Sequence, residues 1–274
     1  MNLVSFLADL ANPHLAFLPR ALLVAMLSAL VCGVVGVHVV LRGLSFVGDA
    51  LSHAVFPGVA IAFALHGSIL LGGAVAGAIV TIAIALFTQN RRIREDSIIG
   101  IFFAAAFALG IVIMARIPGY TGSLESFLFG SLAGVSNTDI LCVAVTAVGI
   151  IGVLLAIHPA LVGVSVDRDH ARTLGINPFV MDAALYMAIA ATVVISVKSI
   201  GNILVLALLV APAACARLLS SNVVTMMLIA PGIGSVSAFL GVWISWEFSL
   251  PAGAAIVLCA AAIFLVVWLV RVRR

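Results

Sequence analysis

Apolar residues run along this chain in nine long blocks that short polar or Gly/Pro-rich stretches separate. The blocks cover residues 20–41, 46–66, 68–88, 97–116, 138–157, 181–198, 201–218, 223–243 and 251–270. Each offers roughly the 20 apolar residues that a helix needs to cross a bilayer. Helices are expected because a backbone in lipid must satisfy its own hydrogen bonds. The pattern predicts an all-α polytopic membrane protein with about eight or nine transmembrane helices, some of them broken or re-entrant.

The composition supports this class of protein. The 274 residues are 65% hydrophobic and only 8% charged, whereas soluble domains carry about 25% charged residues. We therefore expect one transmembrane domain over residues 1–274, surrounded by membrane lipid. The net charge of +3 is small and gives no reason to expect a nucleic-acid partner. Pro57, Pro212 and Pro231 are expected to kink or break the helices that contain them.

The basic residues predict the orientation of the chain. Segment 89–96 and the tail 271–274 hold the densest basic clusters, and positively charged loops stay in the cytoplasm. Alternating from these points leaves three of the thirteen basic residues outside, namely Arg20, Arg116 and Lys198. The expected location is the cell membrane. Nine spans place the N-terminus outside and eight place it inside, so this point stays open.

Asp49 and His53 are the most informative residues of the sequence. Their spacing of four puts both side chains on one face of a helix, one turn apart. A carboxylate inside a span costs about 2.5 to 3.5 kcal/mol, more than the 0.6 to 2 kcal/mol or so that a polar contact between membrane helices returns. This balance favours a functional role over a packing role. Because carboxylate and imidazole both bind divalent metals, we predict that the pair binds a transported metal ion.

Two ligands from one chain make an incomplete metal site. Two copies that meet on a twofold axis would supply four ligands, so a homodimer is expected. A bound metal would keep Asp49 ionised and His53 neutral, and acid should therefore weaken binding. The carboxylate leans to manganese and the imidazole to zinc, which leaves the metal open. Whether Glu125 or Glu247, both predicted on the outer face, joins the metal path also stays open. No tightly bound cofactor is expected.

The connection from His158 to Pro178 contains a short amphipathic pattern, which we predict to be a cytoplasmic coupling segment over about residues 165–178. Asp167 is a suitable N-cap, Ala171 and Leu174 form an apolar edge, and Gly175 lies at the expected C-terminus. Two interpretations are open on the residues alone. Such a helix is usually only a solvated face, and the functional alternative is a docking element for a soluble partner.

Several segments, in the same order along residues 20–270, resemble the permease subunits of the zinc/manganese-type ABC importers. The similarity is closest in the segment that contains Asp49 and His53. The matching stretches are Gly48–Ala60, Glu95–Ile101, Ser126–Leu132, Ala171–Asn177, Leu209–Leu219 and Leu250–Gly253.

The resemblance implies both partners and residue roles. Permeases of this family pair as dimers in the cell membrane, bind two cytoplasmic ATP-binding-cassette ATPase subunits, and receive the metal from an extracytoplasmic solute-binding protein. Asp49 and His53 match the family residues that line the metal path. The ATPase-docking loop of the family corresponds to about Asp167–Asn177, with Asp167, Arg168, Asp169, Ala171, Arg172, Leu174 and Gly175 as coupling residues.

Motifs that are missing from the sequence exclude other classes. It contains no GxxxxGK[ST] phosphate loop, so it is not itself a P-loop ATPase. HExxH and GxSxG motifs are also missing, and no enzymatic activity is expected. The sequence thus predicts a permease that imports zinc or manganese, with iron next, while a separate subunit hydrolyses ATP. The alternatives are an ion-coupled secondary metal carrier and, less favoured, an intramembrane metal-dependent hydrolase.

Overall fold

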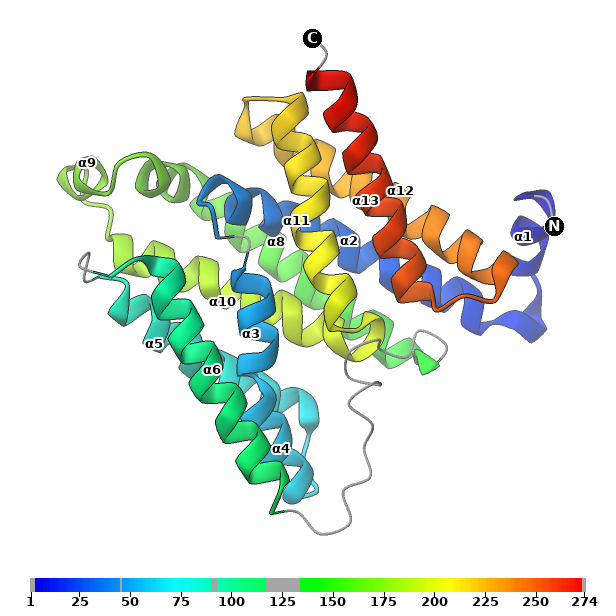
Figure 1. Cartoon of the computed structure of the whole chain (residues 1–274), viewed down its shortest axis with the longest axis horizontal. Coiled ribbons are helices and arrows are strands. Elements are labelled where there is room, and N and C mark those ends of the chain that lie inside the picture. Colours follow the sequence, from blue (N-terminus) through cyan, green and yellow to red (C-terminus); the bar gives the residue numbers. More distant parts are fainter. Residues whose placement is uncertain (1–2, 45, 90–92, 117–133, 273–274) are drawn as a thin grey trace. The chain divides into compact units, whose positions relative to one another are not determined.

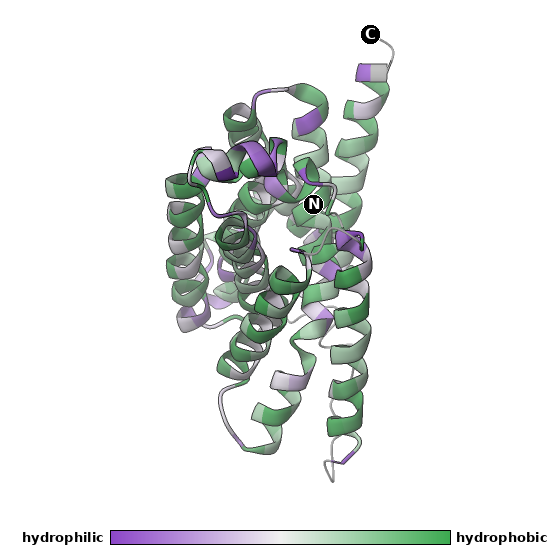
Figure 2. Ribbon diagram, turned by 90° about the vertical axis from the view of Figure 1, so that its left-hand side faces the viewer, coloured by the Kyte–Doolittle hydropathy of each residue, from purple (hydrophilic) through white to green (hydrophobic). Residues whose placement is uncertain are grey.

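The computed structural model describes residues 3–44, 46–89, 93–116 and 134–272, and every element in these ranges is a helix (Figure 1). Most of the helices are apolar along their whole length (Figure 2). The helices are α1 (Leu3–Leu10), η1 (Pro13–Leu15), α2 (Phe17–Leu41), α3 (Val47–Ala54), α4 (Phe56–Ala64), α5 (Ile69–Phe87), α6 (Glu95–Met114), α8 (Asn137–Val166), α9 (Arg168–Thr173), α10 (Pro178–Ile200), α11 (Asn202–Leu219), α12 (Val223–Phe248) and α13 (Ala252–Val272).

Every predicted apolar block lies on a helix. Eight segments in the described residues are long and apolar enough to cross a membrane, and α3 and α4 together form one of them, Val47–Ala64. The remaining block, 201–218, corresponds to the shorter apolar helix α11. The predicted all-α polytopic fold is therefore confirmed. Segment 117–133, which contains Glu125, lies outside the described residues.

One predicted boundary is wrong. The connection was expected to begin at His158, but α8 continues through Pro159 to Val166. The continuation is apolar, and Leu161 and Val164 are buried within it. Packing of these side chains outweighs the single hydrogen bond that Pro159 removes from the helix. The proline therefore does not end the span, and the connection to α9 is much shorter than expected.

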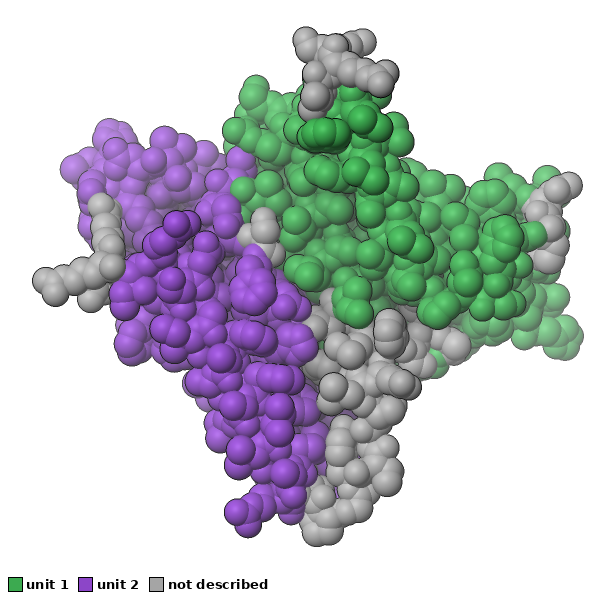
Figure 3. All heavy atoms as spheres, viewed as in Figure 1, with its two compact units in different colours: residues 1–40, 123–149, 195–274 green, residues 41–122, 150–194 purple. Residues whose placement is uncertain are grey.

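The chain divides into two compact units (Figure 3). Unit 1 comprises residues 1–40, 123–149 and 195–274, and unit 2 comprises residues 41–122 and 150–194. The single permease domain over residues 1–274 stays a prediction.

Glycines let the helices of unit 1 approach closely. A β-carbon on Gly36 of α2 would lie 1.9 Å from the carbonyl oxygen of Leu209 in α11. In α12, a β-carbon on Gly241 would lie 2.4 Å from the α-carbon of Ile256 in α13. Small residues at such crossings are the usual basis of helix association in lipid, where no hydrophobic force drives it.

Unit 2 uses the same device where α4 crosses α5. A β-carbon on Gly58 would lie 2.1 Å from the carbonyl oxygen of Gly72, and one on Gly72 would lie 2.3 Å from that of Gly58. Helix α6 packs against α3 and α4 on the same unit. These contacts hold in place the short helix α3, which carries Asp49 and His53.

We expect Gly72→Ala to destabilise the protein by about 1 to 3 kcal/mol, because the new methyl group overpacks a backbone contact. The measurement is the temperature at which the detergent-solubilised protein loses its monodisperse elution peak. Gly149→Ala is the matched control, since a β-carbon there meets no described atom within 4 Å. Equal melting temperatures for the two variants would contradict the close crossing of α4 and α5.

Candidate metal site and coupling segment

Helix α3 brings Asp49 and His53 together. Asp49 lies in the first turn and His53 in the last, and His53 Nε2 is 3.7 Å from Asp49 Oδ1. Their side chains are 28% and 19% exposed. The predicted one-turn spacing is therefore present in the structure, and both side chains are partly exposed.

The sequence after His53 ends this helix abruptly. Pro57 lacks the backbone N–H that would continue the hydrogen-bond ladder of the helix. The helix is interrupted at Val55, between α3 and α4. The break predicted at Pro57 is confirmed. Inside α3, the buried Ser52 donates its hydroxyl hydrogen to the carbonyl oxygen of Asp49 over 2.6 Å. The two candidate ligands thus sit on a separate helix of eight residues.

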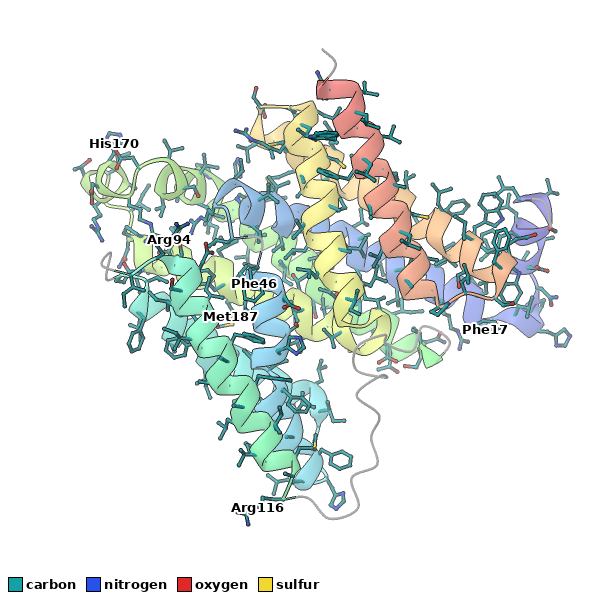
Figure 4. The ribbon with its side chains drawn as sticks, viewed as in Figure 1. Phe17, Phe46, Arg94, Arg116, His170 and Met187 are labelled. Carbon is teal, nitrogen blue, oxygen red and sulfur yellow. The ribbon has the colours of Figure 1, made fainter. Side chains whose placement is uncertain are left out.

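Two phenyl rings of α6 flank the imidazole of His53. The ring centroids of Phe103 and Phe107 lie 5.5 and 5.1 Å from that of His53. The two rings stack on each other at 6.1 Å, with 17° between their planes, and Phe46 meets Phe103 edge-on. Figure 4 labels Phe46 at the start of α3. The imidazole therefore lies between a carboxylate and an apolar wall, which limits its orientations.

The described residues offer no metal site that is complete within one chain. No group of three or more His, Cys, Asp or Glu side chains is close enough to hold an ion in these ranges. Glu247 belongs to unit 1 and Asp49 to unit 2, and Glu125 lies outside the described part of the chain. As a metal site, Asp49 and His53 therefore supply two ligands and leave positions open for others.

The predicted coupling helix is present as α9, Arg168–Thr173. Asp167 caps it, because its Oδ1 accepts hydrogen bonds from the backbone N–H groups of Asp169 (2.9 Å) and His170 (3.0 Å). At the other end, Gly175 has a φ of +78°. The N–H groups of Gly175 and Ile176 bond back to carbonyls of the last turn, which is a Schellman motif. The predicted cap and glycine stop are confirmed.

Helix α9 has a buried side and an exposed side. Ala171 is 1% exposed, whereas Leu174 is 66% exposed. The prediction that these two residues share one apolar edge is wrong, because Leu174 follows the helix as its C-cap and turns outward. Arg172 and Asp169 form an exposed ion pair of 3.1 Å within the helix. Figure 4 labels the neighbouring His170. Arg172 and Leu174 are thus both exposed on the surface of this segment.

The structure also contains a charge cluster that the sequence did not reveal: Arg42, Glu95, Arg168 and Asp182. The carboxylate of Asp182 is fully buried and pairs with Arg42 at 2.6 Å and Arg168 at 3.1 Å. A buried carboxylate needs a cation beside it. A lone acid inside the block 181–198 was the available signal.

We expect Asp167→Ala to loosen α9, because loss of an N-cap costs about 1 kcal/mol. Hydrogen exchange at the amides of residues 169–173 should accelerate about fivefold. Asp169→Ala is the control, since that side chain pairs with Arg172 at the surface. Equal acceleration in both variants would contradict the capping role.

Comparisons with known proteins cover almost the whole chain. Residues 14–271 match the model of the ABC 3 transport family. The chain is 35% identical to the manganese transport system membrane protein MntC of Halalkalibacterium halodurans, over 96% of this chain and 89% of that protein. It is 32% identical to a probable iron transport system membrane protein of Haemophilus influenzae, over 91% and 92% of the two chains.

A solved structure agrees with these sequence matches. PsaBC from Streptococcus pneumoniae in complex with Fab superposes with a TM-score of 0.85 at 32% identity, over 97% of this chain and 95% of that one. The helices, their order and the sequence thus match one group of proteins from end to end, and this multi-pass membrane protein belongs to the ABC 3 transport family.

Proposed function

We propose that this chain is the transmembrane permease of an ATP-binding-cassette importer that moves a divalent transition metal into the cytoplasm. The observation that carries the proposal is the pair of Asp49 and His53, adjacent on one short helix inside a predicted span. Ionisable side chains within spans commonly line ion paths. The family match supports the same function, because relatives carry names for manganese and iron transport.

A second copy of the chain would complete the site. Two chains related by a twofold axis place two carboxylates and two imidazoles around one ion. Asp49 and His53 are both partly exposed, which supports contact with such a copy. A transport site must also release its ion, so a shell that forms and opens again suits the task better than a closed cage. We therefore propose that the permease works as a homodimer.

Manganese is the first candidate for the transported metal, followed by iron and zinc. One carboxylate and one imidazole in each copy form a mixed oxygen and nitrogen set, which accepts all three ions. Three relatives with 35% identity are named for manganese transport, which supports manganese as the first candidate.

The coupling segment is proposed to bind the ATPase. The exposed Arg172 and Leu174 offer a cation and an apolar side chain on the outer surface of α9. A partner that covers Leu174 would gain about 1.5 to 3 kcal/mol from its burial. We further propose that each copy binds one of two ATPase subunits, and that an extracytoplasmic binding protein delivers the metal on the other side.

We expect Asp49→Asn and His53→Ala to abolish metal uptake at limiting external metal, because each removes one of the two ligands that a copy supplies. The measurement is the content of every first-row divalent metal in cells that lack this chain and are complemented with each variant. His14→Ala is the control, since that histidine is exposed outside the predicted spans.

Wild type that restores one metal, while the two variants do not, names the substrate and supports the site. Full uptake by Asp49→Asn would remove the carboxylate from the proposed path. Restoration of no metal by wild type would overturn the proposed function. Uptake that persists without any ATPase and follows an ion gradient would favour a secondary carrier.

A second prediction concerns the docking surface. Leu174→Ser should weaken co-purification of the ATPase about tenfold, since a loss of about 1.4 kcal/mol is a factor of ten in affinity. Val224→Ser is the matched control, because Val224 is 56% exposed on α12 and outside the coupling segment. Unchanged recovery of the ATPase with Leu174→Ser would contradict docking at α9.

A further inference from the structure

Arg168 links the coupling helix to two spans of unit 2. It is the first residue of α9, next to the capping Asp167. One of its terminal nitrogens, Nη2, lies 3.1 Å from the carboxylate of Asp182 in α10 and 3.6 Å from that of Glu95 in α6. A short helix that is tied at its first residue to two carboxylates moves together with them.

The charge cluster and its hydrogen-bond partners come from six helices or helix ends. Arg42, just after α2, also donates to the hydroxyl of Ser165 near the end of α8. Gln89, just after α5, donates to Asp182, and the buried Tyr186 of α10 donates to Glu95. Two arginines and two carboxylates balance in formal charge, so the cluster needs no further ion for neutrality.

Within this cluster, Arg168 does a different task from Arg42. Arg42 is 6% exposed and lies 2.6 Å from the fully buried Asp182, so this pair already compensates the buried carboxylate. Arg168 is 23% exposed and bridges Asp182 to Glu95. Removal of Arg168 would leave the inner pair in place and would remove the ion pairs that connect α9 to Glu95 and Asp182.

Helix α6 extends this link to the candidate metal ligands. Glu95 is its first residue, and Phe103 and Phe107 follow two and three turns later against the imidazole of His53. At 1.5 Å per residue these positions lie about 12 to 18 Å along one continuous helix. A shift of the start of α6 therefore reaches the rings beside His53 without passing through a loop.

We propose that Arg168 is a positioning residue that transmits movement of α9 to the Asp49–His53 pair through Glu95 and α6. The inference rests on the proposed function, because it requires that a partner ATPase moves α9. It adds a specific mechanical link: an ion pair at the start of α6 and an aromatic contact farther along the same helix. Energetic coupling between distant sites is carried by chains of packed side chains, ion pairs and rigid helices.

The test uses the whole transporter, purified through a tag on this chain and reconstituted in lipid vesicles with its binding protein. Uptake of Mn²⁺ and of Zn²⁺ is measured together with ATP hydrolysis, and co-purified ATPase is quantified. Arg168→Gln should keep the ATPase bound and should lower the number of ions moved per ATP about 2- to 30-fold. Arg168→Lys should recover part of the ratio, because it restores the charge.

Glu95→Gln tests the same ion pair from its other partner, since it leaves the pair of Arg42 and Asp182 intact. If Arg168 and Glu95 act as one link, the double variant should lose no more coupling than the more affected single variant. Arg271→Gln is the control, because Arg271 is exposed and donates a hydrogen bond to the backbone carbonyl of Leu219 within unit 1.

The outcomes separate the two proposals. Wild-type vesicles that take up neither ion would overturn the proposed function and this inference with it. Wild-type uptake with an unchanged ratio of ions to ATP in Arg168→Gln and Glu95→Gln would overturn this inference alone. Loss of bound ATPase in Arg168→Gln would also overturn it, since Arg168 would then serve docking rather than transmission. If the fold-losses in ions moved per ATP of the two single variants multiply in the double variant, Arg168 and Glu95 do not act as a single link.

Discussion

A carboxylate without solvent exposure needs a cation beside it, and Asp182 meets this constraint with two arginines. Arg42 directly follows α2 and Arg168 is the first residue of α9, so one carboxylate in α10 holds cations from two other parts of the chain. Buried ion pairs add little net stability compared with apolar packing. Their value here is positional, because apolar helices can slide past one another while a charge pair accepts few registers.

The charge cluster and the Asp49–His53 pair, both in unit 2, differ in whether the set of polar groups is complete within one chain. This difference suits them to different roles. The charge cluster is balanced, with two cations and two carboxylates joined by three ion pairs. Asp49 and His53 are partly exposed and supply only two ligands. A closed set of charges suits a fixed mechanical link, whereas an open set suits an ion that enters and leaves.

Local sequence signals predicted what depends on local structure. The apolar blocks predicted the helices, and the spacing of four residues predicted the contact of Asp49 with His53. Asp167 and Gly175 predicted the two ends of α9. The charge cluster was missed because Arg42 and Asp182 are 140 residues apart. Helices that are apolar on all sides carry no pattern that says which face meets which neighbour. The extension of α8 past Pro159 was missed for the same reason, since packing decided it.

The break at Val55 gives the proposed site a particular mechanical property. Asp49 and His53 both belong to α3, a helix of eight residues that ends before Pro57 and packs against α6. Because both ligands belong to one short helix, a displacement that α6 imposes moves them together and preserves their spacing. In the proposed dimer the same displacement changes the distance to the ligands of the second copy. The ion would then lose half of its ligands in one step, which allows release without unfolding either half of the site.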